Sequence, residues 1–480
     1  MHQLAKLDHQ YVWHPFTQMR DWLKREPIVI VEGDGATVRD TQGREYLDAN
    51  SSIWTNLHGH RNRRLNAAIT RQLNKIAHTS ALGFANEPAS LLARELVEVA
   101  NRPLKQRGSQ AGTGAGRKPK PYLGKVFFSD DGSTAMEVAL KLCYETARRT
   151  GLSRRPRFLS LGGAYHGDTV GAVSAGHIDL FHKAYSGLLF KTDQVPAPYC
   201  YRCRFNRAKP DRADAREYRQ CRWECLARLE TTLARKKKTG EPYAGFLFEP
   251  LMQGAAGMIA QPSGWLKQAA GMARQHGALL LADEVMTGFG RTGQPNVSLF
   301  ASHKEGLQPD FLSVAKGLTG GYLPMAATLT TQRVYDAFLG EYAQFKTFFH
   351  GHSFTANQLG AAAGLESLSM LQSAASIRQR ATLEKTFTKA LNELWECPLV
   401  GDIRQVGLVA GIELVKDWKT RQRFPLEEQA GIRVCDAMAK RGVLTRPVGS
   451  VIVLMPPYCS TTAEIRRMTG TLFRALEVLR

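Results

Sequence analysis

The middle of the chain alternates short apolar runs with longer segments of helical spacing, and this pattern restricts the fold more than any other feature. Mainly apolar runs occupy residues 125–129, 157–161, 245–249, 278–285 and 310–314. Short runs without regular polar alternation are typical of strands buried on both faces. Strands that alternate with helices usually form a mostly parallel sheet. The pattern therefore predicts a large α/β domain with a mostly parallel sheet.

The two ends of the chain predict a second, smaller α+β domain, since 480 residues exceed what one small core needs. We expect a hairpin over 35–50 with its turn at Gly43, then helices over 64–77 and 88–100. Further along, a long helix over 355–395, strands over 402–415 and 443–455, and a final helix over 463–479 are expected. We divide the chain into small-domain segments 1–75 and 346–480 and a large domain over 76–345.

Residues 127–134 join the end of an apolar run to a polar turn and the start of a helix. Gly132 lies in this turn, and the helix opens at Ser133 or Thr134. Free amide groups and the helix dipole at such a point bind phosphate well. Taken alone, the motif favours a plain helix N-cap.

Three other strand ends carry reactive or polar side chains. Asp283 and Glu284 end an otherwise apolar run, where a positively charged ligand atom would offset their burial. Lys316 follows the run 310–314, and a lysine without water around it becomes a nucleophile toward aldehydes. Tyr165, in the glycine-flanked loop 162–169, could stack on a flat cofactor ring. The alternatives are a solvated strand end, a surface lysine and an ordinary loop tyrosine.

These four motifs occur in an order and spacing that resemble the class III (ω-) aminotransferases of pyridoxal phosphate (PLP) fold type I. The resemblance covers nearly the whole chain apart from two basic segments, about 103–121 and 199–240. It implies that Lys316 holds PLP as a Schiff base and moves the proton, and that Asp283 pairs with the pyridine nitrogen. The remaining cofactor contacts that it implies are Tyr165 on the ring, Gly132 and Ser133 at the phosphate, and His352 and Ser353 reaching it from the partner subunit of a homodimer.

A narrower resemblance is to the members of this class that convert 8-amino-7-oxononanoate into 7,8-diaminononanoate in biotin synthesis. The segments that carry it are 13–17 (Trp-His-Pro-Phe-Thr), 51–54 (Ser-Ser-Ile-Trp), 56–60 (Asn-Leu-His-Gly-His), 349–354 (Phe-His-Gly-His-Ser-Phe) and 445–449 (Thr-Arg-Pro-Val-Gly). It implies that Tyr165 and Lys316 also contact the substrate. It further implies that Phe16, Trp54 and Gly351 line the substrate pocket, and that Arg446 binds the substrate carboxylate through its planar fork of donors.

The amino donor is left open between S-adenosylmethionine and lysine. Members that use S-adenosylmethionine typically have Tyr at the position of Phe16, a second Trp at Thr55, and Pro-Thr at His352 and Ser353. The residues found here are similar to those of the branch that uses lysine. Another ω-aminotransferase, acting on a diamine or ω-amino acid with a 2-oxo acid, is the alternative function.

The net charge of +21 is concentrated in two segments, which argues against an extended nucleic-acid-binding face. Residues 101–125 carry seven Lys or Arg and no acid, and residues 201–240 carry thirteen Lys or Arg against five acids. We interpret both as solvated insertions, since no nucleic-acid-binding motif accompanies them. Residues 112–118 are rich in glycine but lack the preceding strand and the Lys-Ser/Thr ending of a phosphate loop.

Eight cysteines do not form a disulfide framework in a chain of this length. Cys200, Cys203, Cys221 and Cys225 cluster in the second basic segment and could bind zinc, with a reduced, metal-free loop as the alternative. We expect no other metal. No signal peptide or membrane span is recognisable, so we expect a cytoplasmic protein that acts on small molecules, with neither nucleic acid nor membrane as a partner.

Overall fold

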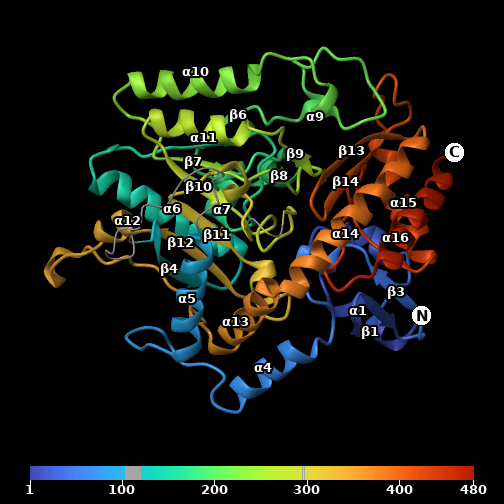
Figure 1. Cartoon of the computed structure of the whole chain (residues 1–480), viewed down its shortest axis with the longest axis horizontal. Coiled ribbons are helices and arrows are strands. Elements are labelled where there is room, and N and C mark those ends of the chain that lie inside the picture. The colour runs from blue at the N-terminus through green and yellow to red at the C-terminus, as the bar shows by residue number, and fades with distance from the viewer. Residues whose placement is uncertain (103–120, 295, 297) are drawn as a thin grey trace.

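The computed structural model describes residues 1–102, 121–294, 296 and 298–480, and its centre is a seven-stranded sheet (Figure 1). The strand order is β4-β12-β11-β10-β7-β5-β6. β12 runs antiparallel to both of its neighbours, whereas the pairs from β11 to β6 are parallel. The mostly parallel α/β sheet is therefore confirmed. The strands are β4 (Leu123–Ser129), β5 (Phe158–Leu161), β6 (Asp193–Val195), β7 (Gly245–Phe248), β10 (Leu279–Asp283), β11 (Phe311–Val314) and β12 (Ala326–Thr331).

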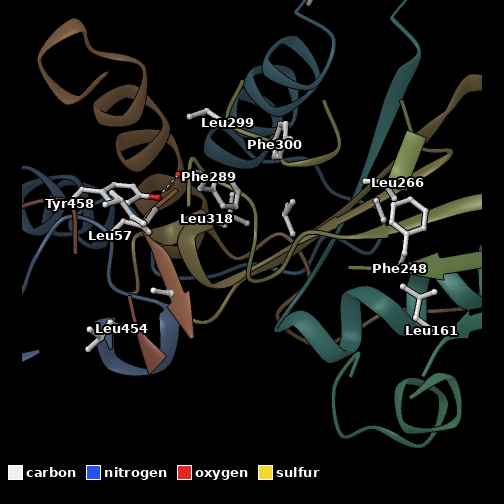
Figure 2. Close-up of a cluster of buried hydrophobic side chains, with 14 of the residues drawn as sticks. Leu57, Leu161, Phe248, Leu266, Phe289, Leu299, Phe300, Leu318, Leu454 and Tyr458 are labelled. Carbon is white, nitrogen blue, oxygen red and sulfur yellow. Dashed lines mark hydrogen bonds between the residues drawn. The ribbon is translucent and has the colours of Figure 1, made fainter. Parts of the chain in front are cut away.

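Helices cover both faces of this sheet, as the apolar runs predict. In β10, Leu279 and Leu281 face the core of α6 (Gly132–Arg149), whereas Leu280 and Ala282 belong to the main core on the other face. That second face is covered by α5 (Glu87–Ala100), α10 (Glu224–Lys238), α11 (Trp265–Gln275) and α13 (Gln358–Gln372). The main core continues toward the small domain, where Tyr458 donates a hydrogen bond to the carbonyl of Phe289 at 3.0 Å (Figure 2).

The small domain is built from both ends of the chain, which lie on the same side of the molecule in Figure 1. Its first sheet joins β1 (Ile30–Asp34), β2 (Thr37–Asp40) and β3 (Glu45–Asp48) to the parallel strand β15 (Val443–Leu444). Its second sheet contains β13 (Val400–Val406), β14 (Val409–Leu414), β17 (Val451–Leu454) and β16 (Pro447–Val448). Three helices accompany them: α14 (Ala374–Asn392), α15 (Ala430–Lys440) and α16 (Thr462–Ala475). The boundaries at 75 and 345 stay a prediction.

Some expected elements are confirmed and others divide. The hairpin at Gly43 forms between β2 and β3, and the helices expected over 64–77 and 88–100 are α4 (Arg63–Leu73) and α5. The expected helix over 355–395 is instead broken at Ser373, which has extended backbone and caps α14. The segment 402–415 is two strands, because Gly407 turns at a φ of 62°. The strand β12 was not predicted; its threonines weaken the apolar pattern.

The remaining helices and strands are short. They are α1 (Gln3–Tyr11), α2 (Met19–Trp22), α3 (Ser51–Trp54), α7 (Val170–Ala175), α8 (Asp179–His182), α9 (Ala215–Tyr218), α12 (Gln332–Asp336), β8 (Met252–Gln253) and β9 (Ile259–Ala260). Within the described ranges, no helix has the length and apolar character that crossing a membrane requires. Residues 103–120, which include the glycine-rich run 112–118, lie outside the described residues.

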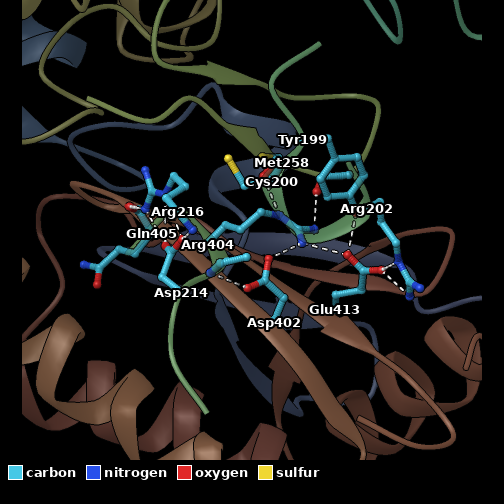
Figure 3. Close-up of polar contacts among 12 residues, drawn as sticks. Tyr199, Cys200, Arg202, Asp214, Arg216, Met258, Asp402, Arg404, Gln405 and Glu413 are labelled. Carbon is cyan, nitrogen blue, oxygen red and sulfur yellow. Dashed lines mark hydrogen bonds and ion pairs between the residues drawn. The ribbon is translucent and has the colours of Figure 1, made fainter. Parts of the chain in front are cut away.

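The second basic segment is only partly solvated, which corrects part of the interpretation of its charge. Arg202 donates to Glu413 of β14, while Arg404 of β13 donates to Asp402 and Glu413 at 2.8 and 2.7 Å (Figure 3). Arg216 binds Asp214 and the carbonyl of Gln405. These contacts fasten the segment to the sheet of the small domain. The charges of these arginines are therefore used inside the molecule.

The last part of the same segment is a core helix. α10 places Leu226, Leu229 and Leu233 in the main hydrophobic core, and it packs against α11. In this segment, Cys200 and Cys225 are buried, and Trp265 Nε1 donates to Cys225 Sγ at 3.3 Å. In the part of the chain that the structure describes, no three His, Cys, Asp or Glu side chains are arranged to hold a metal ion. Zinc and a reduced, metal-free loop both stay predictions for the four cysteines.

Candidate active site

Lys316 lies directly beyond the carboxyl end of β11, as its sequence context predicts. Its backbone adopts a positive φ of 43°, and a Cβ on the following Gly317 would come within 2.9 Å of Leu57 and 3.1 Å of Phe289. Only glycine therefore lets the chain turn tightly here. Burial lowers the pKa of the Lys316 amine to about 8, although the negative charges of Asp283 and Glu249 oppose this effect. The amine is thus available in its neutral, nucleophilic form near neutral pH.

Trp54 covers this amine, with Lys316 Nζ 4.5 Å from the centre of its ring. Trp54 ends a short turn, α3, in which Ser51, Ser52, Ile53 and Trp54 have φ values of 46°, 48°, 63° and 71°. Such left-handed conformations cost roughly 1–2 kcal/mol for each non-glycine residue. Strain of this size persists only where the surroundings enforce it, which is typical of functional sites.

The two acids at the end of β10 have different partners. Asp283 Oδ2 lies 2.8 Å from His166 Nδ1, and its other oxygen accepts from the amide of Val285 at 3.0 Å. Glu284 instead accepts from the amide and hydroxyl of Ser302 at 2.8 and 2.6 Å, inside the protein. Asp283 alone is therefore presented toward the Lys316 site, as predicted for the residue that meets a positive ligand atom.

His166 and Glu249 complete the charged surroundings of Asp283. Burial disfavours the charged form of His166, but its bond to Asp283 and the charges of Asp283 and Glu249 outweigh burial and raise its pKa. Glu249 accepts from the amides of Gly254 and Tyr165, and burial together with the charge of Asp283 raises its pKa to about 7. The site therefore combines a carboxylate with a histidine that supports its negative charge.

The N-terminus of α6 offers a phosphate site at Gly132 and Ser133. Asp131 and Thr134 form a capping box that satisfies the Thr134 amide at 2.8 Å. Among the described residues, the amides of Gly132 and Ser133 donate to no protein group. A Cβ on Gly132 would lie 2.6 Å from Val285 Cγ1, so the helix end approaches the strand end closely. Free amides at a helix N-terminus are the donors that phosphate prefers.

The loop 162–169 closes over this helix end. The Thr169 amide donates to Ser133 Oγ at 3.0 Å, and Gly167 has a φ of 121°. A Cβ on Gly167 would lie only 2.3 Å from Ser133 Oγ, so glycine is required for the loop to reach the helix. This contact brings Tyr165 and His166 to the same end of the sheet as Ser133.

Tyr165 and Phe16 belong to one group of aromatic side chains. The hydroxyl of Tyr165 donates to Asp168 at 2.6 Å, and its ring lies 6.2 Å from that of Phe181. Phe16 packs edge-on against Phe181 at 5.2 Å between ring centres. The N-terminal segment is therefore brought to Tyr165 through Phe181, although Phe16 itself remains 60% exposed.

Arg446 lines a cavity of about 490 Å³ beside the α3 turn. Apolar side chains such as Ile30 and Ile53 form much of its wall, and Asp48, Ser52 and His60 add polar groups. Because β15 pairs with β3, Leu444 lies next to Asp48 and sets the position of Arg446 two residues later. This arrangement suits a ligand with an apolar chain and a terminal carboxylate.

The segment 349–354 is not joined to Lys316 within one chain. His352 Nδ1 lies 3.8 Å from Asp130 Oδ2, near the start of α6, while the carbonyl of Ser353 lies 2.8 Å from His78 Nε2. Gly351 is exposed, with open space where a Cβ would be. The roles predicted for Gly351, His352 and Ser353 across a subunit interface stay predictions.

Sequence reasoning did not assign a role to His166, Glu249 or Asp48. His166 is adjacent to Tyr165 in a glycine-flanked loop, which is a weak signal for it. Glu249 follows the apolar run of β7, in the same relation as Asp283 to β10, and could have been found by that rule. Asp48 gives no signal, since its partners lie in a turn with unusual backbone.

Comparisons with known proteins agree with this geometry. A family model described as aminotransferase class-III matches residues 19–476. The chain is 44% identical over 476 residues to the adenosylmethionine-8-amino-7-oxononanoate aminotransferase of Geobacter sulfurreducens, covering 99% of this chain and 98% of that protein. The solved structure of the enzyme of the same name from Methanocaldococcus jannaschii superimposes with a TM-score of 0.87 at 37% identity, covering 99% of this chain and 98% of that one. The solved structure of an ω-transaminase from Pseudomonas jessenii, in complex with PMP, superimposes with a TM-score of 0.86 at 27% identity. The superposition covers 99% of this chain and 98% of that one.

Proposed function

This chain belongs to the class III aminotransferases, and we propose that it transfers an amino group to 8-amino-7-oxononanoate, giving 7,8-diaminononanoate for biotin synthesis. The observation that carries the proposal is the full-length similarity to relatives named for this substrate, at up to 44% identity. The cavity at Arg446 supports it, because its apolar wall and single guanidinium match an alkyl chain with a terminal carboxylate.

The cofactor of this family is pyridoxal 5′-phosphate, and the residues present fit it. Two free amides at the start of α6 suit the phosphate, and the glycines at 132 and 167 leave the space that the approach requires. Asp283 suits a protonated ring nitrogen, and the Lys316 amine suits the aldehyde carbon. When bound, the cofactor supplies a ring that withdraws electrons from the carbon bearing the amine.

The residues of this chain would perform the remaining tasks. Lys316 would hold the cofactor through its amine, and the same amine would accept and return the proton of the substrate carbon. Asp283, held by His166, keeps a negative charge opposite the ring nitrogen. Trp54 covers the Lys316 amine and limits the access of water. Tyr165 would contact the cofactor ring, and Arg446 would orient the substrate through its carboxylate.

The amino donor is proposed to be S-adenosylmethionine or lysine. The names of the curated relatives contain adenosylmethionine. The residues Phe16, Thr55, His352 and Ser353 are instead similar to those of the lysine-using branch. Phe16 packs against Phe181 at 5.2 Å, so this departure falls beside Tyr165.

We also propose a homodimer with a shared active site and a cytoplasmic location. The exposed segment 349–354, with Phe349 and Phe354 at 69% and 59% exposure, supports a subunit interface. A fully active monomer at working concentration would contradict the dimer.

Half-reactions on the PLP-loaded protein test the function. The absorbance of the bound cofactor is followed after adding S-adenosylmethionine or lysine separately, and then after adding 8-amino-7-oxononanoate. Bleaching by one donor and recovery with the ketone is the expected result. If neither donor bleaches the cofactor and an ω-amino acid with a 2-oxo acid does, the alternative ω-aminotransferase function replaces the proposal. A Lys316→Ala protein that still holds the cofactor covalently would contradict the role of Lys316.

A further inference from the structure

The left-handed turn Ser51–Trp54 contacts both the Lys316 amine and the cavity that contains Arg446. On one side, Trp54 places its ring 4.5 Å from Lys316 Nζ. On the other side, Ser52 and Ile53 line the cavity that contains Arg446. Contacts that hold the turn therefore fix both the position of Trp54 over the Lys316 amine and the wall of the Arg446 cavity.

The buried carboxylate of Asp48 accepts two hydrogen bonds from Ser52, in the middle of this turn, and also binds residues beside it. Asp48 Oδ1 accepts from the amides of Ser52 and Asn50 at 3.0 and 3.3 Å. Its Oδ2 accepts from the hydroxyl of Ser52 at 2.8 Å and lies 3.2 Å from His60 Nε2. Asp48 is only 6% exposed, so water competes little for these bonds.

Backbone and side-chain contacts fix the ends of the turn. The amides of Trp54 and Thr55 donate to the carbonyls of Asn50 and Ser51, both at 2.9 Å. Ser51 Oγ donates to the carbonyl of Met455 at 2.6 Å, and Trp54 Nε1 donates to Asn50 Oδ1 at 2.9 Å. In the middle of the turn, Ser52 and Ile53 have φ values of 48° and 63°. Besides its bonds to Asp48, Ser52 is held there through its carbonyl, which accepts from the hydroxyl of Thr55 at 3.0 Å. A β-branched residue such as Ile53 avoids this conformation unless neighbours impose it. Asp48 supplies that constraint through Ser52.

We propose that Asp48 is a positioning residue for the transamination, because its carboxylate holds the strained turn that places Trp54 over Lys316 and forms the wall facing Arg446. Asp48 touches neither reacting atom, so it acts through the turn. The proposal rests on the proposed function only for the identity of the ketone. The donor half-reaction, which the placement of Trp54 also affects, does not involve the ketone.

The test compares Asp48→Ala and Asp48→Asn with a matched control, Asp40→Ala. An asparagine keeps an oxygen that accepts from the Ser52 amide, whereas alanine removes all acceptors. Asp40 is also a buried aspartate of the first small-domain sheet, and it accepts from the amides of Gln42 and Arg44 in the hairpin turn. It does not line the Arg446 cavity. The control thus measures the loss of a buried turn-holding carboxylate away from the site.

Asp48→Ala is expected to lower the rate of the donor half-reaction by about tenfold or more and to raise KM for the ketone several-fold, because the reacting groups are no longer held in place. Asp48→Asn is expected to stay within about threefold of the parent, and Asp40→Ala to leave both constants unchanged while lowering the melting temperature. Hydrogen exchange of the cofactor-free protein is expected to accelerate at the amides of 52–55 in Asp48→Ala only.

Three results would overturn the proposal. One is an Asp48→Ala protein with parental kinetics and only a lower melting temperature, and another is an Asp48→Asn protein as impaired as Asp48→Ala. If Asp48→Ala does not fold, Ser52→Ala replaces it, because this change removes one donor to the carboxylate and should lower the same rates by a smaller factor. Parental kinetics of Ser52→Ala would then be the third overturning result. Failure of the proposed function can be told apart from failure of the Asp48 proposal. In the first case the parent protein would not aminate 8-amino-7-oxononanoate, but its donor half-reaction would still show whether Asp48 matters.

Discussion

Replacing Gly167 with alanine is expected to weaken cofactor binding strongly while leaving the fold intact. The residue has a φ of 121°, a conformation in which side chains other than hydrogen are strained. A Cβ there would lie 2.3 Å from Ser133 Oγ and 2.6 Å from Ser133 Cα, where ordinary contact begins at 3.4 Å. The loop must therefore move by about 1 Å away from the start of α6. That movement breaks the bond from the Thr169 amide to Ser133 and opens the phosphate site.

The magnitude follows from the backbone strain alone. A residue held in such a conformation costs of order 1–3 kcal/mol, which corresponds to roughly fivefold to 150-fold weaker binding. Titration of the cofactor-free protein with PLP, followed by absorbance, measures this directly. Gly162→Ala is the matched control in the same loop, since its nearest neighbour would be the flexible end of Gln194 at 3.3 Å. Parental PLP affinity in a folded Gly167→Ala protein would refute the reasoning.

Three further outcomes are expected. The rate at which the cofactor-free protein captures PLP should rise with pH through about pH 8, because burial lowers the pKa of Lys316 to about 8. Stopped-flow absorbance measures this rate, and a midpoint near the pKa of a free lysine would contradict the prediction. Arg404→Met should destabilise the protein by about 3–5 kcal/mol by removing the buried cation that pairs with Asp402, while Glu413 keeps Arg202. Since burial raises the pKa of Asp402 above its unfolded value, the loss in melting temperature should be small near pH 5 and grow as the pH rises; equal losses at both ends of this pH range would contradict it. Arg446→Gln should raise KM for oxononanoate by roughly tenfold to a hundredfold without slowing the donor half-reaction, and an unchanged KM would remove Arg446 from the site.

Much of the site could be predicted from the sequence because it depends on local patterns. Buried strands have recognisable apolar runs, and polar groups that follow them meet at one edge of a parallel sheet. This rule located Lys316, the pair Asp283 and Glu284, and the start of α6 at Gly132. It could not choose between the two acids, because adjacent residues on a strand end point in different directions and the sequence does not show which direction faces the site. Only the tertiary structure shows that Glu284 is used by Ser302 inside the protein.

The charge of the second basic segment shows the same limit. Composition alone suggested a solvated insertion, because arginines are usually exposed. Arg202 instead binds Glu413, 211 residues away, and Arg216 binds the carbonyl of Gln405, 189 residues away. Composition records how many charges a segment has but not which partners the fold brings to them.

The sequence by itself determined the layered α/β architecture, the contribution of both chain ends to the small domain, and the position of Lys316, Asp283 and Gly132 at strand ends or at the start of a helix. These features follow from periodicity and turn chemistry, which act over a few residues. Only the tertiary structure decided that His166 supports Asp283, that Trp54 covers Lys316, and that Asp48 holds a strained turn between them. Such contacts join residues far apart in the chain, and the strained turn opposes local preference, so it exists only because the packed surroundings enforce it.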